Sequence, residues 1–285
     1  MSRPVAVVPA RNEAARLPAA LAALRREGLR AIVVANGCTD GTAVAARAHG
    51  AEVIETPALP GGAGAARGIG LEAALRRDPA WIATTDADAV LAPGTGDVLR
   101  RALLRADAAF GRVVPDLEEV ARLPTPVRRH GLLEDRRAAL RALIGGDLAA
   151  CPWNPLPCHG QSPGALIAWR PAAYRATGGM PPAPREEDRR MAAALARARL
   201  RVARPWEAVV VASCRTRGRA PGGMAATIAA RARADLTAET AALASECAAL
   251  EHRLAALMPR AAWPDLPMTH TEGDRDVLPL RQAAI

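Results

Sequence analysis

Short apolar runs alternate with helix-like segments through the first third of the chain, and this alternation limits the possible folds more than any other feature. Four runs have the length and composition of buried strands: Val5–Pro9, Ala31–Ala35, Ala51–Glu55 and Trp81–Thr85. Helical patterns separate them at Ala19–Arg26, from Thr39 or Asp40 to His49, and at Ala65–Arg77. Such repeats are typical of a mainly parallel sheet covered by helices, so we predict an α/β fold.

The fourth predicted strand ends directly in Asp86-Ala87-Asp88. Alternate side chains of an extended backbone point to one side, so the two carboxylates are expected to face the same way. Open α/β sheets bind ligands outside the carboxyl ends of their strands. We therefore predict a ligand site here, with a plain Asp-rich turn as the alternative.

The remainder of the chain is less regular. We predict three further strands, two helices and a Pro-rich loop: Ala108–Val114, Ala165–Trp169 and Ala208–Ala212; Glu134–Ile144 and Glu187–Arg199; and Pro152–Pro163. Gly222–Met258 has the pattern of one long helix or two shorter ones. We expect residues 1–220 to form one domain, and residues 221–285 to form a C-terminal helical extension and tail.

Leucines recur every seventh residue in the predicted C-terminal helix, at Leu236, Leu243, Leu250 and Leu257. About three heptads support the pattern, which suits either a packing seam against the chain's own domain or a homodimer helix. We favour the internal seam.

The chain's charge of +9 would ordinarily suggest nucleic acid as a partner. All 38 basic residues are arginine, which indicates a coding bias, and only 2% of residues are aromatic. We therefore predict no nucleic-acid partner. Five scattered cysteines without a signal peptide indicate reduced thiols and a cytoplasmic protein. Without an apolar run of ~20 residues, membrane contact is expected to be peripheral at most.

The segment Gly64–Gly70 looks like the glycine-rich cofactor turn of short-chain dehydrogenases. In a Rossmann unit that turn follows the first strand, whereas here it follows the third. The dehydrogenases also share a Tyr and Lys catalytic pair, and this chain has no lysine. We reject the nicotinamide interpretation.

The same segment fits a different series of motifs. These are Val8-Pro9-Ala10-Arg11-Asn12-Glu13, Val34–Thr42, Gly64–Gly70, Asp86-Ala87-Asp88, and Gly178-Gly179-Met180 followed by Glu186-Glu187-Asp188. In this order they resemble the family 2 glycosyltransferases of GT-A fold, over roughly Val5 to Arg219. The resemblance implies a Rossmann-like nucleotide-binding sheet, with residues 1–106 as the nucleotide-sugar half and residues 107–220 as the acceptor half.

The resemblance also implies a role for each motif. Contacts to the nucleotide fall to Pro9, Ala10, Arg11, Glu13, Asn36, Arg67 and Asp86. Asp88 is expected to hold Mn²⁺ or Mg²⁺ on the diphosphate, since these ions prefer hard oxygen ligands. Asp188 is expected to be the general base that takes the acceptor's hydroxyl proton, with Glu187 as its structural partner. The alternative for these two acids is simple stabilisation of a helix N-terminus.

The expected reaction moves a sugar from a nucleoside-diphosphate sugar to a hydroxyl of a small molecule, glycan or lipid, with inversion. Asn36 stands where the family usually has an acid, so UDP and GDP donors both stay open, with UDP favoured. The Gln-x-x-Arg-Trp segment of processive members is missing, so we expect the addition of one sugar.

Several other residues are weaker candidates. Arg215, Arg217 and Arg219 are candidates to close over the diphosphate. His159, Gln161 and Ser162 lie where the family's acceptor site begins, and Trp153 and Trp206 are candidates to stack on a sugar.

Two other functions stay open at this point. A nucleotidyltransferase has a similar sheet, but usually has a Gly-rich turn with Arg and Lys where this chain has Ala10–Glu13. A catalytically silent nucleotide-sugar-binding or scaffold protein would keep the fold and lose the acids that this chain retains.

Overall fold

The computed structural model describes residues 2–145, 151–183, 185–216, 218, 223–264 and 266. The chain divides into two compact units. We name the first the sheet unit; it comprises Met1–Val114, Pro152–Asn154 and Gln161–Ala212. The second, which we name the helical unit, comprises Pro115–Cys151, Pro155–Gly160 and Ser213–Ile285.

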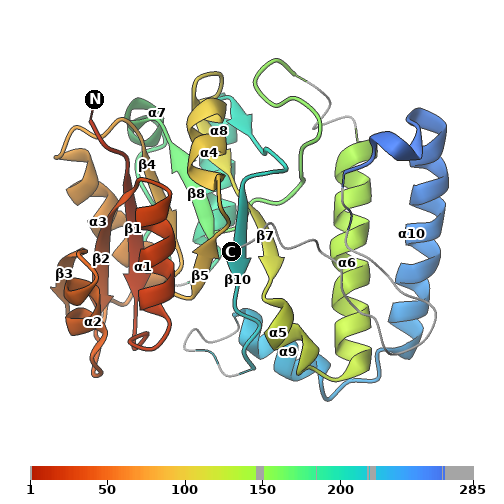
Figure 1. Cartoon of the computed structure of the whole chain (residues 1–285), viewed down its shortest axis with the longest axis horizontal. Helices are drawn as coiled ribbons and strands as arrows, with labels where there is room; N and C mark the ends of the chain where they lie inside the picture. The colour runs from red at the N-terminus through yellow and green to blue at the C-terminus, as the bar shows by residue number, and fades with distance from the viewer. Residues whose placement is uncertain are drawn as a thin grey trace. The chain divides into compact units, whose positions relative to one another are not determined.

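The described strands all begin in the sheet unit, and Figure 1 labels several of them. They are β1 (Val5–Ala10), β2 (Arg30–Asn36), β3 (Glu52–Thr56), β4 (Ile82–Thr85), β5 (Ala89–Leu91), β6 (Ala108–Phe110), β7 (Arg112–Pro115), β8 (Leu166–Trp169), β9 (Val202–Ala203) and β10 (Val209–Ala212). Its helices are α1 (Leu17–Arg26), α2 (Thr42–Ala48), α3 (Gly62–Leu75), α4 (Thr95–Leu103), α7 (Pro171–Ala176) and α8 (Glu187–Arg197). The helical unit contains α5 (Leu117–Ala121), α6 (Thr125–Ile144), α9 (Met224–Arg231), α10 (Thr237–Leu257) and the short 3₁₀ helix η2 (Arg260–Ala262).

The larger sheet has the order β3-β2-β1-β4-β8-β6-β9. Strands β3, β2, β1 and β4 are parallel, as predicted, while β8 runs antiparallel to both β4 and β6. A second sheet has the order β5-β10-β7. The predicted α/β fold with a mainly parallel sheet is confirmed.

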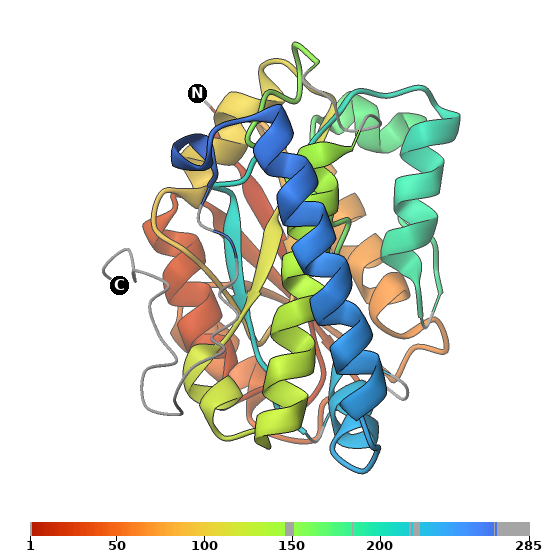
Figure 2. The ribbon, with the colours of Figure 1, turned by 90° about the vertical axis from the view of Figure 1, so that its right-hand side faces the viewer.

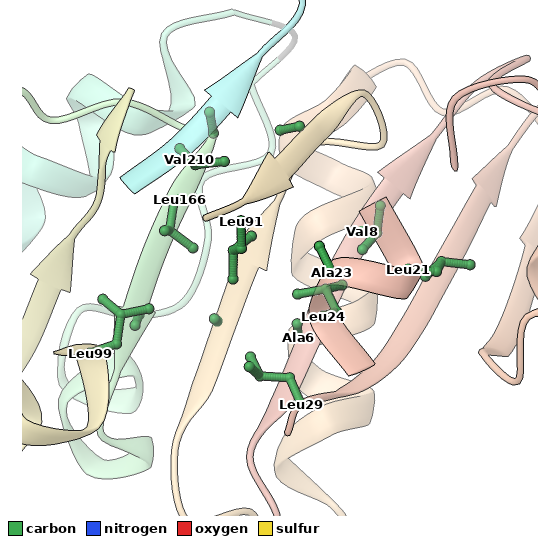
Figure 3. Packing of buried hydrophobic residues seen from close by; sticks show 14 of the residues in the cluster. Ala6, Val8, Leu21, Ala23, Leu24, Leu29, Leu91, Leu99, Leu166 and Val210 are labelled. Carbon is green, nitrogen blue, oxygen red and sulfur yellow. The ribbon is translucent and has the colours of Figure 1, made fainter. Parts of the chain in front are cut away.

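Strand β1 is buried on both faces, as expected of a central parallel strand. Its even-numbered residues Ala6 and Val8 join a hydrophobic cluster with Leu21 and Leu24 of α1, which Figure 3 shows beside them. The odd-numbered Val5 and Val7 belong to a second cluster that includes residues of α3 and α8. The period-two alternation of the strand therefore builds one core on each side of the sheet.

The glycine-rich segment forms helix α3 rather than a cofactor turn. A Cβ atom on Gly70 would overlap Cγ1 of Val7 and lie 2.9 Å from Cγ2 of Val34, so the missing side chain allows α3 to pack closely on the sheet. A Cβ atom on Gly64 would lie 2.6 Å from the carbonyl oxygen of Pro181. The glycines are thus required by packing at two positions of one helix.

We expect Gly70→Ala to lower the free energy of unfolding by about 1–3 kcal/mol, because the added methyl group overpacks the core against Val7. Gly68→Ala is the matched control in the same helix. Its Cβ would have no atom nearer than 3.7 Å, so the higher helix propensity of alanine should leave stability unchanged or raise it by up to about 1 kcal/mol. Urea denaturation of the two variants tests this; equal losses would contradict the packing argument.

The predicted single strand Ala108–Val114 is wrong. The chain forms β6, leaves the larger sheet at Gly111 and enters the smaller sheet as β7. Gly111 donates its N–H to the carbonyl oxygen of Leu166 at 2.9 Å, and a Cβ here would lie 2.8 Å from Cγ of Leu166. The glycine allows the backbone to cross this side chain and change sheets.

Helix α6 begins at Thr125, well before the predicted start at Glu134. Pro126 lies in its first turn, where the missing N–H costs no intrahelical hydrogen bond. The C-terminal pattern resolves into two helices, α9 and α10, one of the two options that the sequence left open.

Helices α6 and α10 lie side by side in the helical unit (Figures 1 and 2). Leu243 and Leu254 of α10 are buried in a cluster with Leu133 and Leu140 of α6, whereas Leu257 is 63% exposed. The leucine pattern is therefore an internal packing seam, and a homodimer through this helix finds no support. The expected domain boundary near residue 220 stays a prediction. Among the described helices, none has a run of apolar residues long enough to cross a membrane.

Candidate functional site

Three parallel strands end at one edge of the larger sheet. In the pairing register Ala10 of β1 lies opposite Ala35 of β2, and Val7 of β1 lies opposite Thr84 of β4. Strands β2 and β3 lie on one side of β1, whereas β4 lies on the other side, so the strand order reverses between β1 and β4. Open α/β sheets bind ligands at such a reversal. The residues that follow these strands therefore gather at one edge.

The loop after β1 is bonded to the loop after β2. Asn12 adopts a left-handed conformation with φ of 56°, and its Oδ1 accepts the N–H of Thr39 at 2.8 Å. The N–H of Glu13 donates to Oγ1 of Thr42 at 2.8 Å. Of the candidates here, Ala10 and Glu13 are buried, Pro9 is half-buried and Arg11 is exposed.

Asp40 lies just before α2, which begins at Thr42 with Gly41 as its N-cap, later than the predicted start at Thr39 or Asp40. Its two carboxylate oxygens accept the N–H groups of Thr42 at 3.0 Å and of Ala14 at 3.2 Å. Burial by itself would raise the pKa of Asp40, but these hydrogen bonds and one from the Thr42 hydroxyl outweigh it and lower the pKa below its ordinary value.

The Asn36 side chain is buried and holds the loop between β3 and α3. Its Oδ1 accepts the N–H of Leu59 at 2.8 Å, and its Nδ2 donates to the carbonyl oxygen of Gly62 at 3.3 Å. The expected nucleobase contact stays a prediction, and both ends of the amide already have backbone partners.

Arg67 is buried on α3 and joins two distant segments. Its Nη1 donates to Oε1 of Glu187 and its Nη2 to Oδ1 of Asp86, and Nη2 also donates to the carbonyl oxygen of Gly164 at 3.1 Å. The residue after β4 and the first residue of α8 are thus held on one guanidinium group. The arginine was predicted to contact the nucleotide, and that role stays a prediction.

Helix α8 begins with the two candidate catalytic acids. Glu186 precedes them with φ of 58°, a conformation that non-glycine residues rarely adopt. Asp188 accepts the N–H of Gly164 on Oδ2 at 3.1 Å and that of Arg189 on Oδ1 at 2.8 Å. Asp188, Glu187 and Asp86 are therefore linked through Gly164 and Arg67.

Comparison with known proteins identifies the family to which the first half of the chain is matched. The model of glycosyl transferase family 2 matches residues 5–146, a stretch that contains β1 to β4, α3 and Asp86-Ala87-Asp88. Residues 5–146 are a family 2 glycosyltransferase domain. The protein is therefore a glycosyltransferase that uses nucleotide sugars. No curated protein matches the chain.

Solved glycosyltransferase structures have the same fold as this transferase. TarS residues 1–349 from S. aureus, in complex with UDP-GlcNAc, aligns with a TM-score of 0.54 and 16% identity over 89% of this chain and 73% of that one. Glucosyl-3-phosphoglycerate synthase from Mycobacterium tuberculosis, in complex with Mn²⁺, UDP and phosphoglyceric acid, aligns with a TM-score of 0.51 and 21% identity over 86% and 78% of the two chains. These likenesses confirm the GT-A fold.

The transferase has two carboxylate side chains after β4 that are candidate ligands of a divalent cation. The described residues contain no group of three or more His, Cys, Asp or Glu side chains arranged for a metal. Magnesium is usually held by one or two carboxylates together with substrate phosphates, and Asp86 and Asp88 flank one residue at the end of β4. The expected metal contact of Asp88 stays a prediction.

The weaker acceptor candidates of the transferase have structural partners. Oε1 of Gln161 accepts the N–H of Val113 at 2.7 Å, and Oγ of Ser162 accepts a hydrogen bond from Arg204 at 3.0 Å. His159 is buried and belongs to the helical unit. Arg217 and Arg219 lie outside the described residues, while Arg215 lies within them.

Both tryptophan candidates of the transferase contribute to packing. Trp206 is 5% exposed, with the guanidinium group of Arg112 4.5 Å from its ring centroid, and Trp153 packs on the cluster beside α1. Sugar stacking by either ring stays a prediction.

Gly164 is a part of this site that no sequence motif indicated. The residue acts through its backbone, because its N–H donates to Asp188 and its carbonyl oxygen accepts from Arg67. A glycine after a proline in a Pro-rich loop carries no signal for such a role. The one available hint is its place just before the predicted strand Ala165–Trp169.

Proposed function

We propose that this transferase moves a single sugar from a nucleoside-diphosphate sugar to a hydroxyl acceptor, with inversion at the anomeric carbon and with a divalent metal. The observation that carries the proposal is the link between Asp188 and Asp86 through Gly164 and Arg67. It joins the candidate base to the strand end that carries Asp88.

Asp188 takes the role of general base. Glu187 is paired with the buried Arg67 guanidinium group, and we assign it the role of structural partner. Asp188 accepts the backbone N–H groups of Gly164 and Arg189, and its carboxylate takes the proton from the attacking hydroxyl. Inversion requires this hydroxyl to attack from the face opposite the leaving diphosphate.

Asp88 is the proposed metal ligand. When bound, Mn²⁺ or Mg²⁺ stabilises the negative charge that develops on the departing diphosphate. A uridine nucleotide is the favoured donor, since the two similar structures described above contain UDP-GlcNAc or UDP, and one of them contains Mn²⁺.

The remaining features of the proposal come from the sequence. The acceptor is a small molecule, a glycan or a lipid, and the reaction takes place in the cytoplasm. No disulfide joins any of the five cysteines, which agrees with a reducing compartment. The family match favours a glycosyltransferase over the nucleotidyltransferase alternative. A transfer assay on the wild type distinguishes an active enzyme from a catalytically silent scaffold.

A thermal-shift panel of UDP, GDP, dTDP and CDP, each with and without Mn²⁺, tests the donor site. We expect one nucleotide, with metal, to stabilise the wild type by about 2.7 kcal/mol at a hundredfold excess over Kd. Asp88→Asn should lose this metal-dependent shift. Asp97→Asn, on the exposed side of α4, is the control and should keep it. A shift that is independent of metal, or equal in the wild type and Asp88→Asn, would refute the metal assignment.

A further inference from the structure

Arg67 lies in a closed circuit of contacts. Its Nη1 donates to Glu187, and the next residue, Asp188, accepts the N–H of Gly164 at 3.1 Å. The carbonyl oxygen of Gly164 then accepts from Nη2 of Arg67, also at 3.1 Å. One guanidinium group and one glycine residue therefore fix the first turn of α8 from two sides.

Burial makes this circuit rigid. The Arg67 side chain is 3% exposed and that of Glu187 is 13% exposed. A buried guanidinium group requires paired charges, and its planar fork holds two acceptors in fixed directions. Both terminal nitrogens are already bonded to protein oxygens, whereas an arginine that lies along a nucleotide needs terminal nitrogens available to the ligand.

We propose that Arg67 is a positioning residue that acts through Glu187 and Gly164 to hold the carboxylate of Asp188 at the transfer site. The proposal rests on the proposed function of Asp188 as base. Arg67 also binds Asp86, so the same guanidinium group keeps α8 in register with the end of β4 that carries Asp88. A displacement of about 1 Å in a reacting group can cost about 10²-fold in rate, which sets the expected size of the effect.

The test compares Arg67→Lys, Arg67→Met, Glu187→Ala and the double variant Arg67→Met/Glu187→Ala, with Arg76→Met as the control. Arg76 lies at the end of the same helix and is exposed. Each variant is assayed for kcat and for donor KM, and the Kd of the preferred nucleotide is measured by thermal shift. Lysine keeps the charge but has no planar fork, so it tests geometry separately from charge.

We expect Arg67→Met to lower kcat by about 10²-fold and Glu187→Ala to lower it by up to the same factor, with nucleotide Kd changed by less than about threefold. The double variant should lose no more than Arg67→Met alone, because the contact to Glu187 is one of the two through which Arg67 acts on Asp188. Arg67→Lys should show an intermediate loss, and Arg76→Met should match the wild type.

Three results would overturn the proposal. A raised nucleotide Kd with kcat unchanged would make Arg67 a nucleotide contact. Losses that multiply in the double variant would indicate independent roles. A wild-type kcat in Glu187→Ala, which keeps the arginine and its contacts to Asp86 and Gly164, would exclude action through Glu187. Failure of the proposed function can be distinguished from failure of this proposal, because in the first case the wild type itself would transfer no sugar.

Discussion

Replacement of Asp188 by asparagine should lower sugar transfer by about 10²–10⁴-fold and leave the fold and nucleotide binding intact. A positioned general base contributes a factor of this size, and an amide cannot take the proton of the attacking hydroxyl. Asparagine has nearly the size of aspartate, and its Oδ1 can still accept the N–H of Gly164 that now lies 3.1 Å from Oδ2. The measurements are the rate of nucleoside-diphosphate release with acceptor present and the nucleotide thermal shift.

Glu186→Gln is the matched control for this experiment. Glu186 precedes the two acids directly, its side chain is 60% exposed and it pairs with Arg189 at 2.9 Å. Loss of an exposed ion pair changes stability by less than about 1 kcal/mol, so transfer should stay close to the wild-type rate. A fully active Asp188→Asn variant would exclude Asp188 as the base. A wild type that binds nucleotide but transfers no sugar to any acceptor would favour the silent scaffold.

Leu254→Ala should lower the free energy of unfolding of the helical unit by about 2–5 kcal/mol. Leu254 is fully buried in the cluster between α10 and α6, with Leu133, Leu140 and Leu143 among its members. Truncation removes buried apolar area and leaves a cavity between two packed helices. Chemical denaturation followed by far-UV circular dichroism measures the effect, since α6 and α10 are long helices.

Leu257→Ala is the control, one turn further along the same helix. Its side chain is 63% exposed, so the same truncation should change stability by no more than about 0.5 kcal/mol. Light scattering should give the same mass for both variants and the wild type. A larger loss in Leu257→Ala, or a fall in mass, would indicate that a second chain covers this helix and would restore the dimer interpretation of the leucine pattern.

The positions of the motifs near the strand ends were predictable because each motif follows its strand directly in the sequence. Each predicted strand from Val5 to Thr85 lies within about one residue of an observed one, and Asp86 follows β4 directly. Buried parallel strands require apolar runs, and their register places the following loops at one edge, so the sequence pattern carries both facts. The leucine spacing likewise predicted a packing seam, which α10 forms with α6.

The partners of the polar side chains were not predictable in this way. The nucleotide contacts of Asn36 and Arg67 stay predictions, and the structure adds that Asn36 bonds to the loop at Leu59, and Arg67 to Asp86 and Glu187. The Arg67–Glu187 contact spans 120 positions of the chain, and no local pattern encodes which of many arginines and acids will meet across such a distance.

The sequence by itself determined the α/β class, the parallel core around β1 and the order of the motifs along the chain, because periodicity and strand-end position are local properties. Only the tertiary structure decided that the chain changes sheets at Gly111, that α6 begins at Thr125, and that Gly164 closes a circuit with Arg67 and Asp188. Those outcomes depend on which backbone and side-chain groups come together from distant segments, and packing selects them only when the whole sheet unit or helical unit assembles.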